Sequence, residues 1–546
     1  MTSNNKHLNL VLWILGLGLG LGLSLGCQKN SDTHSYSIGN KNFNSSNLNP
    51  INTDELTTQT TITVTNLKGE ALAGAQVLIG MSANDPFENN FVRTNINGQA
   101  IIDNNQWTNQ PVTINYPGYN RVTFYGVNPG QHTYQLRPVV YSGKYELKGR
   151  TTDFGKLVSR DDKADFGLVI QSLTRNDLFS FDLGMIVSKE QDTLSVAGYS
   201  VRIPSNVSLP RQVESYFIDL TIDKPSYRTY FEMPGTKKMY ALRGQFPFNR
   251  IVNEFRNNTP FQALINQFNF LGGSIRDVEI TSNHQMDIPV NEIVFGNPIK
   301  VKLSPSMTQT MNQKTLLTIT ANEKDGYIFP SDLKKFDNPN GTMNLKTSEL
   351  GSKYVIAILK RSEDFYATKA KQAAIALSMK PILANSKEIE INQQLDLIAQ
   401  PEGNLDGWMQ NTIMSKLPGV EPIGTYAKLT RHQNFGSNVE NVNVLWEAYA
   451  PIWVLGMKLP IWPTDNGFSN MSGNSEYSDN SDYSSSEFEI DTAVSEYHRW
   501  EVTYIGSDVI PEGNNNRSSP LSLPVVPLGP QLADYATHIS YNNKDF

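Results

Sequence analysis

The 546-residue chain contains a single cysteine, Cys27, so no internal disulfide bond can form and a disulfide-based fold is excluded. The folded state must depend on buried apolar cores and on hydrogen-bonded secondary structure. Hydrophobic residues make up 39% of the chain. At this length we expect about three or four domains of ordinary size.

The residues before Cys27 have the pattern of an export signal. A short polar start with Lys6 precedes the stretch 8–26, which has no charged residue and ends in small residues. This order of basic start, apolar core and small residues is typical of a secretory signal peptide, so we predict one at 1–26. An uncleaved membrane anchor, which needs about 20 apolar residues, is the alternative. The glycines that alternate with leucine in this stretch disfavour a helix.

The position of Cys27 directly after Gly26 resembles a bacterial lipoprotein signal, although Ser24 stands where leucine is usual. The resemblance implies that Cys27 carries acyl chains and anchors the protein in a membrane, because two or more chains give stable attachment. Gln28, rather than aspartate, favours the outer membrane. We therefore expect a lipid-anchored protein of the bacterial cell envelope, either periplasmic or exposed at the surface.

Composition favours a mainly β protein and excludes one class of partner. Short runs rich in valine, isoleucine, threonine and tyrosine, separated by turn residues, predict strands. Only 18% of residues are charged, and the net charge of −7 is spread without long blocks of one sign. A nucleic-acid partner is not expected, since such binding needs a concentrated basic face.

The chain divides into a flexible start, four β-rich segments and a tail. We predict several β-sandwich domains in series with one small helical insertion. The predicted segments are a flexible tether at 27–58, a β-sandwich at 59–140, β-rich domains at 141–305 (with helices at 247–270), 306–400 and 401–510, and a proline-containing tail at 511–546.

The segment 59–140 has the most regular pattern. A strand at Thr61–Thr65 is followed by a Gly-Ala-x-Val strand at Ala73–Ile79, a hairpin with Gly98, and a Gly118-Tyr119 turn. This order resembles the carboxypeptidase-regulatory-like, transthyretin-type β-sandwich and the Ig-like repeats of bacterial surface proteins. The resemblance implies a spacer or an accessory binding module and brings no catalytic residue.

The sequence contains no complete catalytic motif of the kinds we considered. None of the seven histidines lies within four residues of another, and no Gly-x-Ser-x-Gly elbow is present. The run Ser331-Asp-Leu-Lys334 and the later Lys346-Thr-Ser348 are similar to motifs of penicillin-recognising enzymes. Matches this short are expected by chance, so we predict no cofactor and leave an enzymatic role open.

Two regions between 446 and 487 are candidates for binding. The loop 464–487 places Asp465, Asp479 and Asp482 among serines and asparagines, and their oxygens could bind a structural calcium ion. A solvated hairpin loop explains the same residues better. Three tryptophans precede the loop, Trp446, Trp453 and Trp462. Such rings serve as sugar-binding faces or as core residues, and we favour the core.

These observations favour a non-enzymatic envelope lipoprotein that presents β-sandwich domains for structural, adhesive or assembly contacts. Its expected partners are the membrane, through the lipid anchor, and other envelope proteins or surface glycans. A carbohydrate- or peptide-binding protein is the main alternative, and an envelope hydrolase is a third.

Overall fold

The computed structural model describes much of the chain beyond residue 58. The described residues are 59–66, 68–82, 92–103, 107–138, 145–152, 163–174, 191–196, 199–204, 226–231, 234–247, 250–251, 253–254, 257, 259, 261–281, 284–311, 313–336, 341–363, 374–410, 417–434, 440–462, 495–509, 525–526 and 535–546.

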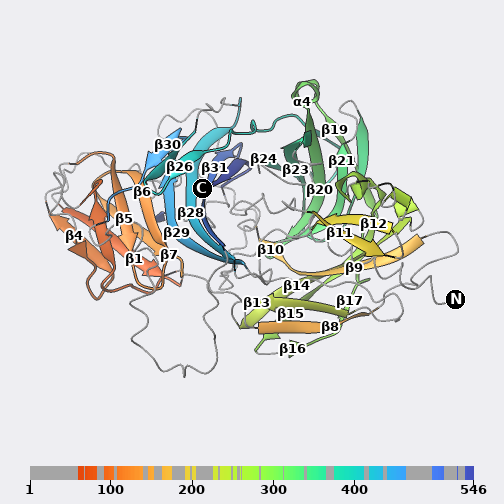
Figure 1. The fold of residues 1–546 in the computed structure, drawn as a ribbon, viewed down its shortest axis with the longest axis horizontal. Coiled ribbons are helices and arrows are strands. Elements are labelled where there is room, and N and C mark those ends of the chain that lie inside the picture. The colour runs from red at the N-terminus through yellow and green to blue at the C-terminus, as the bar shows by residue number, and fades with distance from the viewer. Residues whose placement is uncertain are drawn as a thin grey trace. The chain divides into compact units, whose positions relative to one another are not determined.

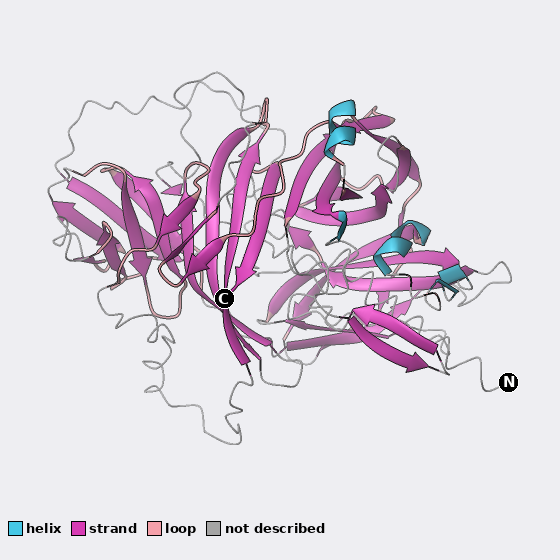
Figure 2. Cartoon of the chain, turned by 45° about the horizontal axis from the view of Figure 1, so that its top comes forward, coloured by secondary structure: helices cyan, strands magenta, loops and turns pink. Residues whose placement is uncertain are grey.

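The predicted mainly β fold is confirmed. Strands account for almost all of the regular structure, with only short helical turns between them (Figure 2). In the region predicted to hold helices, 247–270, helical residues occur at 250–251 and 253–254, and the 3-10 helix η4 covers Phe261–Gln267. The helix α4 (Pro305–Thr310) was not predicted. No helix in the described part is long and apolar enough to cross a membrane.

The chain folds into two compact units, and each is built from separated stretches of sequence. The described residues of unit 1 lie within Tyr141–Ile398 and Ala536–Tyr541, and those of unit 2 lie within Gly39–Val140, Ala399–Tyr535 and Asn542–Phe546. The last strand, β33 (His538–Asp545), therefore contributes residues to both units. The finer domain boundaries expected from the sequence stay predictions.

The described residues of unit 2 form three sheets, and Figure 1 labels strands of each. The largest has the order β31-β28-β29-β6-β5-β2-β3, the second β32-β7-β1-β4, and the third β26-β27-β30. The strands are β1 (Gln59–Asn66), β2 (Gln76–Ile79), β3 (Val92–Arg93), β4 (Gln99–Asp103), β5 (Gln110–Asn115), β6 (Arg121–Val127), β7 (Gln131–Leu136), β26 (Glu402–Asn404), β27 (Gly407–Met409), β28 (Glu421–Asn434), β29 (Glu440–Ala450), β30 (Gly456–Lys458), β31 (Ser495–Ser507) and β32 (Val525–Val526).

Parallel pairing joins distant parts of the chain within unit 2. Strand β6 pairs with β29 in parallel, with Arg121 opposite Trp446 and Phe124 opposite Tyr449. Strand β1 also pairs in parallel with β7. Parallel neighbours need a long connection between them, and Thr123 on β6 and Trp446 on β29 are 323 positions apart.

The turn predicted around Gly98 is present, but it does not close a hairpin, because β3 before it pairs with β2 and β4 after it pairs with β1 in another sheet. The glycine of this turn is required. Gly98 has a φ of 72°, a left-handed conformation that favours glycine. A Cβ atom at this position would lie 2.5 Å from the backbone oxygen of Val64. The turn thus fixes the register of β4 against β1, in which Ile62 lies opposite Ala100.

In unit 1, the residues that the structure describes form five sheets. Their orders are β10-β21-β20-β23-β24 with the first part of β33, β18-β15-β14-β9, β13-β8-β16 with β17 beside β8, β22-β19-β25, and the hairpin β11-β12. The strands are β8 (Tyr145–Thr152), β9 (Lys163–Gln171), β10 (Leu173–Thr174), β11 (Gln191–Val196), β12 (Tyr199–Pro204), β13 (Ser226–Phe231), β14 (Gly235–Pro247), β15 (Asn269–Ile280), β16 (His284–Gln285), β17 (Ile288–Pro289), β18 (Ile293–Val294), β19 (Asn297–Leu303), β20 (Lys314–Lys324), β21 (Tyr327–Phe336), β22 (Thr342–Thr347), β23 (Ser352–Arg361), β24 (Ile375–Ile382) and β25 (Glu388–Ile391).

The central strands of unit 1 are buried along nearly their whole length. In β20 only the residues at the two ends have appreciable exposure, and β23 is buried from Val355 to Lys360. Because both faces of such strands are covered, their sequences are continuous apolar and threonine runs rather than strict alternation.

Candidate functional site

The tryptophans proposed as a ligand surface lie mostly inside unit 2. Trp446 is 1% exposed and Trp462 is 2% exposed, so neither ring presents a face to solvent. Trp446 Nε1 donates a hydrogen bond of 2.8 Å to Thr123 Oγ1 on β6. This contact satisfies the polar group of a buried ring and ties β29 to β6.

Arg121 lies between the two buried rings. Its guanidinium carbon is 4.9 Å from the centre of the Trp446 ring and 4.8 Å from that of Trp462. Both distances are within the range of cation–π attraction. The charged group thus occupies the space that a ligand would need in order to stack on these rings.

Trp453 is the third of these tryptophans, and it is half-buried. Its Nε1 donates a hydrogen bond of 2.8 Å to the backbone oxygen of Ile505, and its ring meets Tyr504 edge to face at 6.2 Å. The Tyr504 hydroxyl in turn donates to the backbone oxygen of Val454 at 2.5 Å. These contacts hold the loop after β29 against β31.

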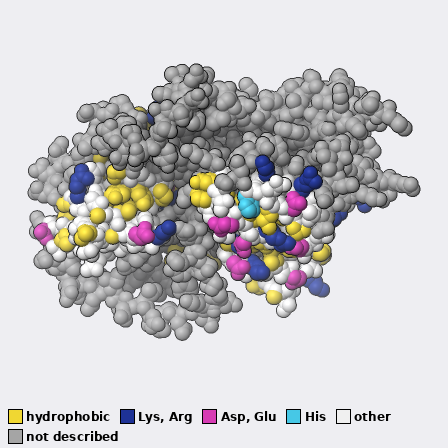
Figure 3. Space-filling view, turned by 90° about the horizontal axis from the view of Figure 1, so that it is seen from below, with side chains coloured by type: hydrophobic (Ala, Val, Ile, Leu, Met, Phe, Trp, Pro, Cys, Tyr) yellow, Lys and Arg dark blue, Asp and Glu magenta, His cyan; other side chains and the backbone are white. Residues whose placement is uncertain are grey.

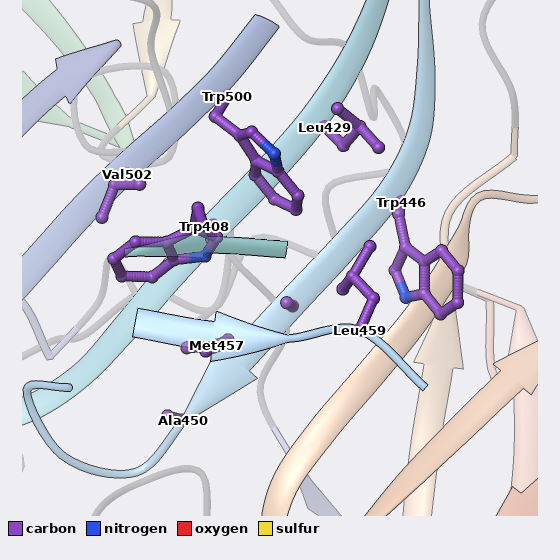
Figure 4. Close-up of a cluster of buried hydrophobic side chains, with 10 residues drawn as sticks. Trp408, Leu429, Trp446, Ala450, Met457, Leu459, Trp500 and Val502 are labelled. Carbon is purple, nitrogen blue, oxygen red and sulfur yellow. The ribbon is translucent and has the colours of Figure 1, made fainter. Parts of the chain in front are cut away.

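A buried cluster fills the space between the large sheet of unit 2 and its three-stranded sheet (Figure 4). Trp408, Trp446 and Trp500 all contribute to it. Trp500 Nε1 donates to the backbone oxygen of Asn404 at 2.7 Å. The aromatic residues of this region therefore serve mainly as core, as favoured from the sequence.

A buried ionic cluster lies in the same unit and was not foreseen. The side chains of Arg137 and Glu447 are 6% and 2% exposed, and Arg137 Nη1 lies 3.8 Å from Glu447 Oε1. The Tyr426 hydroxyl donates to Glu447 Oε1 at 2.9 Å, and the Tyr449 hydroxyl donates to Oε2 at 3.5 Å. The sequence signal for this cluster is Glu447, a charged residue that stands between Trp446 and Ala448 in the apolar part of strand β29.

Burial and neighbouring charges both shift the pKa values of this cluster. Burial acts to lower the pKa of Arg137, but Glu447 and the two tyrosines outweigh it and leave the pKa raised. Burial, with Glu447 second, raises the pKa of Tyr426 well above its ordinary value. Arg137 therefore stays charged and Tyr426 stays protonated, which suits a permanent structural contact rather than proton transfer.

The serine–lysine match is not an active site of the penicillin-recognising kind. Residues three apart share a face in a helix but not in a strand, and Ser331 and Lys334 lie on strand β21. Ser331 is buried, and its Oγ lies within hydrogen-bond distance of the backbone oxygens of Thr320 and Lys346, at 3.2 and 3.3 Å. Lys334 Nζ donates instead to the backbone oxygen of Phe268 at 2.7 Å.

The remaining candidates lie outside the described residues. These are the lipidation candidate Cys27 and the calcium candidates Asp465, Asp479 and Asp482. Within the described part, no group of three or more histidine, cysteine, aspartate or glutamate side chains is arranged to hold a metal ion.

The visible surface mixes charges of both signs. On the face seen from below, basic and acidic side chains of the described residues lie among one another in one region, and apolar side chains gather in another (Figure 3). Ion pairs between strands are among the contacts of the described residues, for example Lys238 with Asp277 at 2.7 Å and Arg431 with Glu496 at 2.7 Å. In such a pair the two opposite charges neutralise each other locally, so the pair creates no concentrated electrostatic field.

No protein-family model and no curated protein matches the chain. Solved structures with partial similarity are the Bacillus anthracis TIE protein (12% identity, 61% of this chain, TM-score 0.13), a streptococcal ancillary pilin (9%, 61%, 0.12) and the Bacillus cereus major pilin BcpA (8%, 61%, 0.12). The matches cover 50%, 99% and 98% of those chains, so this chain spans about half the length of the first. The similarity to β-domains of pilins and surface proteins is distant, and scores this low support no functional conclusion.

Proposed function

We propose that this chain is a lipid-anchored protein of the bacterial cell envelope whose β-structured units make structural or adhesive contacts. The observation that carries the proposal is how unit 2 uses its buried charges. Arg137 and Glu447, and likewise Lys428 and Glu501, pair with each other between strands. Groups paired in this way stabilise one arrangement of strands and are not available to a substrate.

The ties within unit 2 connect strands from distant parts of the chain. Arg499 on β31 holds Asp545 near the last residue, with Nε and Oδ1 at 2.5 Å. The backbone groups of His498 and Phe546 exchange two hydrogen bonds of 3.0 and 2.9 Å. Closing a unit with strands from its beginning and its end opposes stepwise unravelling, a property suited to a protein under mechanical load.

The anchoring part of the proposal rests on the sequence around Cys27. The test is metabolic labelling with a fatty acid in the source bacterium, followed by membrane fractionation. We expect the wild type to carry label and to sediment with membranes, and Cys27→Ser to lose both. Ser24→Leu is the matched control, since it restores the usual leucine and is expected to be labelled at least as well.

The contact role needs a separate measurement. Deletion of the gene is expected to weaken envelope integrity or attachment to surfaces, and the wild-type chain should restore it. Cys27→Ser should fail to restore it despite normal export and folding. Full restoration by the serine variant would contradict an anchored role, whereas saturable binding to a purified glycan would favour the carbohydrate-binding alternative.

A further inference from the structure

Several strands begin or finish at one end of unit 2. Strand β29 runs parallel to β6, so both finish there, at Ala450 and Val127. Strand β7 follows β6 after a short turn and therefore begins at this end, and β1 runs parallel to β7. In this turn the backbone oxygen of Gly130 accepts the N–H of Thr61 at 3.0 Å. The chain that leads from the N-terminal region thus reaches β1, at Gln59, at what we call the entry end of unit 2.

The loop that follows β29 also lies at the entry end. A Cβ atom placed at Gly126, near the end of β6, would lie 3.3 Å from Pro451 Cγ. Thr425 Oγ1 donates a hydrogen bond to the backbone oxygen of Ile452 at 2.7 Å and accepts the N–H of Val454 at 3.1 Å. These bonds fix the backbone of the loop on strand β28, so its side chains have defined directions.

Large apolar side chains are exposed at the entry end. Ile452 is 59% exposed, Leu455 is 47% exposed, and Val509, shortly after β31, is 63% exposed. Strand β31 finishes at this end because it is antiparallel to β28, which is itself antiparallel to β29. Met409 is 56% exposed, and the N–H of the next residue, Gln410, donates to the backbone oxygen of Leu455 at 2.7 Å. We call Met409, Ile452, Leu455 and Val509 the entry patch.

Trp453 lies beside the entry patch and is half-buried. Its Nε1 already donates to the backbone oxygen of Ile505 at 2.8 Å. A Cβ atom placed at Gly506 would lie 3.3 Å from Trp453 Cζ2, so the ring packs on the end of β31. Because its polar group is satisfied within the protein, the ring can lose its remaining contact with water at no cost in hydrogen bonds.

We propose that the entry patch docks on the surface of the bilayer that holds the acyl chains of Cys27. This inference rests on the anchored state proposed above. Residues 28–58 separate Cys27 from β1 and can span at most about 110 Å when fully extended. Since they join unit 2 at the entry end, the anchor keeps the entry patch within reach of lipid. Exposed apolar side chains that gather in one place mark a contact surface of this kind.

Attachment of the chain compensates for the small size of the entry patch. Four side chains would bind a free bilayer weakly, as even a single acyl chain gives only marginal binding. The anchor makes the second contact intramolecular, so a high local concentration of lipid replaces high affinity. Removal of the apolar side chains from water then favours the docked state.

Charges at the entry end determine which lipids suit it. Glu421 begins β28, Asp508 follows β31, and Asp103 ends β4, where it accepts a hydrogen bond from Gln59 Nε2 at 2.8 Å. Carboxylates close to a surface are repelled by anionic headgroups, and salt screens this repulsion. The partner is therefore a zwitterionic lipid surface. Docking should weaken as phosphatidylglycerol is added to phosphatidylcholine at low salt, and should recover at high salt.

The test is quenching of tryptophan fluorescence by lipids with brominated acyl chains. The full chain, purified in detergent from the source bacterium, is reconstituted into phosphatidylcholine vesicles that contain these lipids. We expect quenching of the wild type, and Trp453→Phe should remove the quenched component. The double variant Ile452→Ser with Leu455→Ser should lower the ratio of docked to undocked protein about three- to tenfold.

Ile96→Ser is the matched control. Ile96 is 86% exposed and precedes β4, which begins at the opposite end of unit 2 because it is antiparallel to β1. We expect this variant to be quenched like the wild type. All of these serine substitutions replace exposed side chains, so equal unfolding midpoints should show that the fold is intact.

The anchor and the entry patch fail in different ways. A chain that carries acyl label and sediments with vesicles but is not quenched overturns the docking and leaves the anchor standing. Quenching of a chain without label supports the docking and contradicts the anchor, and the absence of both overturns both. Docking is also overturned if the double variant is quenched like the wild type. It is equally overturned if that variant turns a dimer in detergent into a monomer, since the patch would then bind a second copy.

Discussion

Arg137 and Glu447 form an ion pair inside unit 2, with Nη1 and Oε1 3.8 Å apart and both side chains almost wholly buried. Replacing one member leaves the other charged group buried without compensation. We expect Glu447→Gln and Arg137→Met each to lower the free energy of unfolding by about 3–5 kcal/mol. Chemical denaturation followed by tryptophan fluorescence measures this loss.

The double variant Arg137→Met with Glu447→Gln separates the pair from its surroundings. It removes both charges, so we expect it to lose less stability than the sum of the two single changes. A strictly additive loss would show that the two groups do not stabilise each other. Tyr426→Phe tests the hydrogen bond to the same carboxylate and is expected to cost about 1–2 kcal/mol.

Gly403 packs directly against Trp500. A Cβ atom at Gly403 would lie 2.5 Å from Cδ1 of the Trp500 ring. We expect Gly403→Ala to force the ring or strand β26 to move and to destabilise the protein by about 1–3 kcal/mol. Gly296→Ala is the control, because no atom lies within 4 Å of a Cβ placed there. Equal unfolding midpoints for the two variants would argue against this close contact.

Local sequence patterns predicted the strands but not their partners. The alternation in Thr61–Thr65 was recognised as a strand, and it lies within strand β1 of the structure. Pairing between β6 and β29 depends on contacts such as Thr123 with Trp446, which are 323 positions apart. No local periodicity encodes a contact over that span.

The candidate sites differ in how far the sequence could identify them. The tryptophans near position 450 were recognised, and the core was favoured for them, but their enclosure of Arg121 depends on β6 lying beside β29. Ile452 and Val509 stood in unrelated parts of the sequence. Their place at one end of unit 2 is produced by the pairing of β28 with β29 and β31, so it appears only in three dimensions.

Arg121 contacts two aromatic rings of unit 2. Its guanidinium lies within 5 Å of the centres of the Trp446 and Trp462 rings. We expect Arg121→Ala to cost about 1–2 kcal/mol and Arg121→Lys to cost less, since lysine keeps the charge but loses planar stacking. Because ring contacts respond weakly to salt, the loss should be similar at low and high ionic strength. A loss that disappears in high salt would indicate an ordinary surface ion pair.

Glu388 makes the stability of unit 1 depend on acidity. Hydrogen bonds from Lys300 and then Lys302 hold the pKa of the Glu388 carboxyl at about 2, below the ordinary 4.5, and the two N–O distances are 2.8 and 2.7 Å. The folded state therefore binds protons less readily than the unfolded chain. The contribution to stability is present above pH 4.5 and is lost as the pH falls toward 2.

The matching variant is Glu388→Gln, which removes the charge and keeps the shape. We expect it to unfold at a lower denaturant concentration than the wild type at neutral pH and low salt. The difference should shrink with added salt, because the carboxyl is exposed, and should vanish at pH 2. Denaturation curves at both pH values measure it. A difference of the same size at pH 2 would mean that glutamine acts by packing and that the contacts from Lys300 and Lys302 contribute nothing through charge.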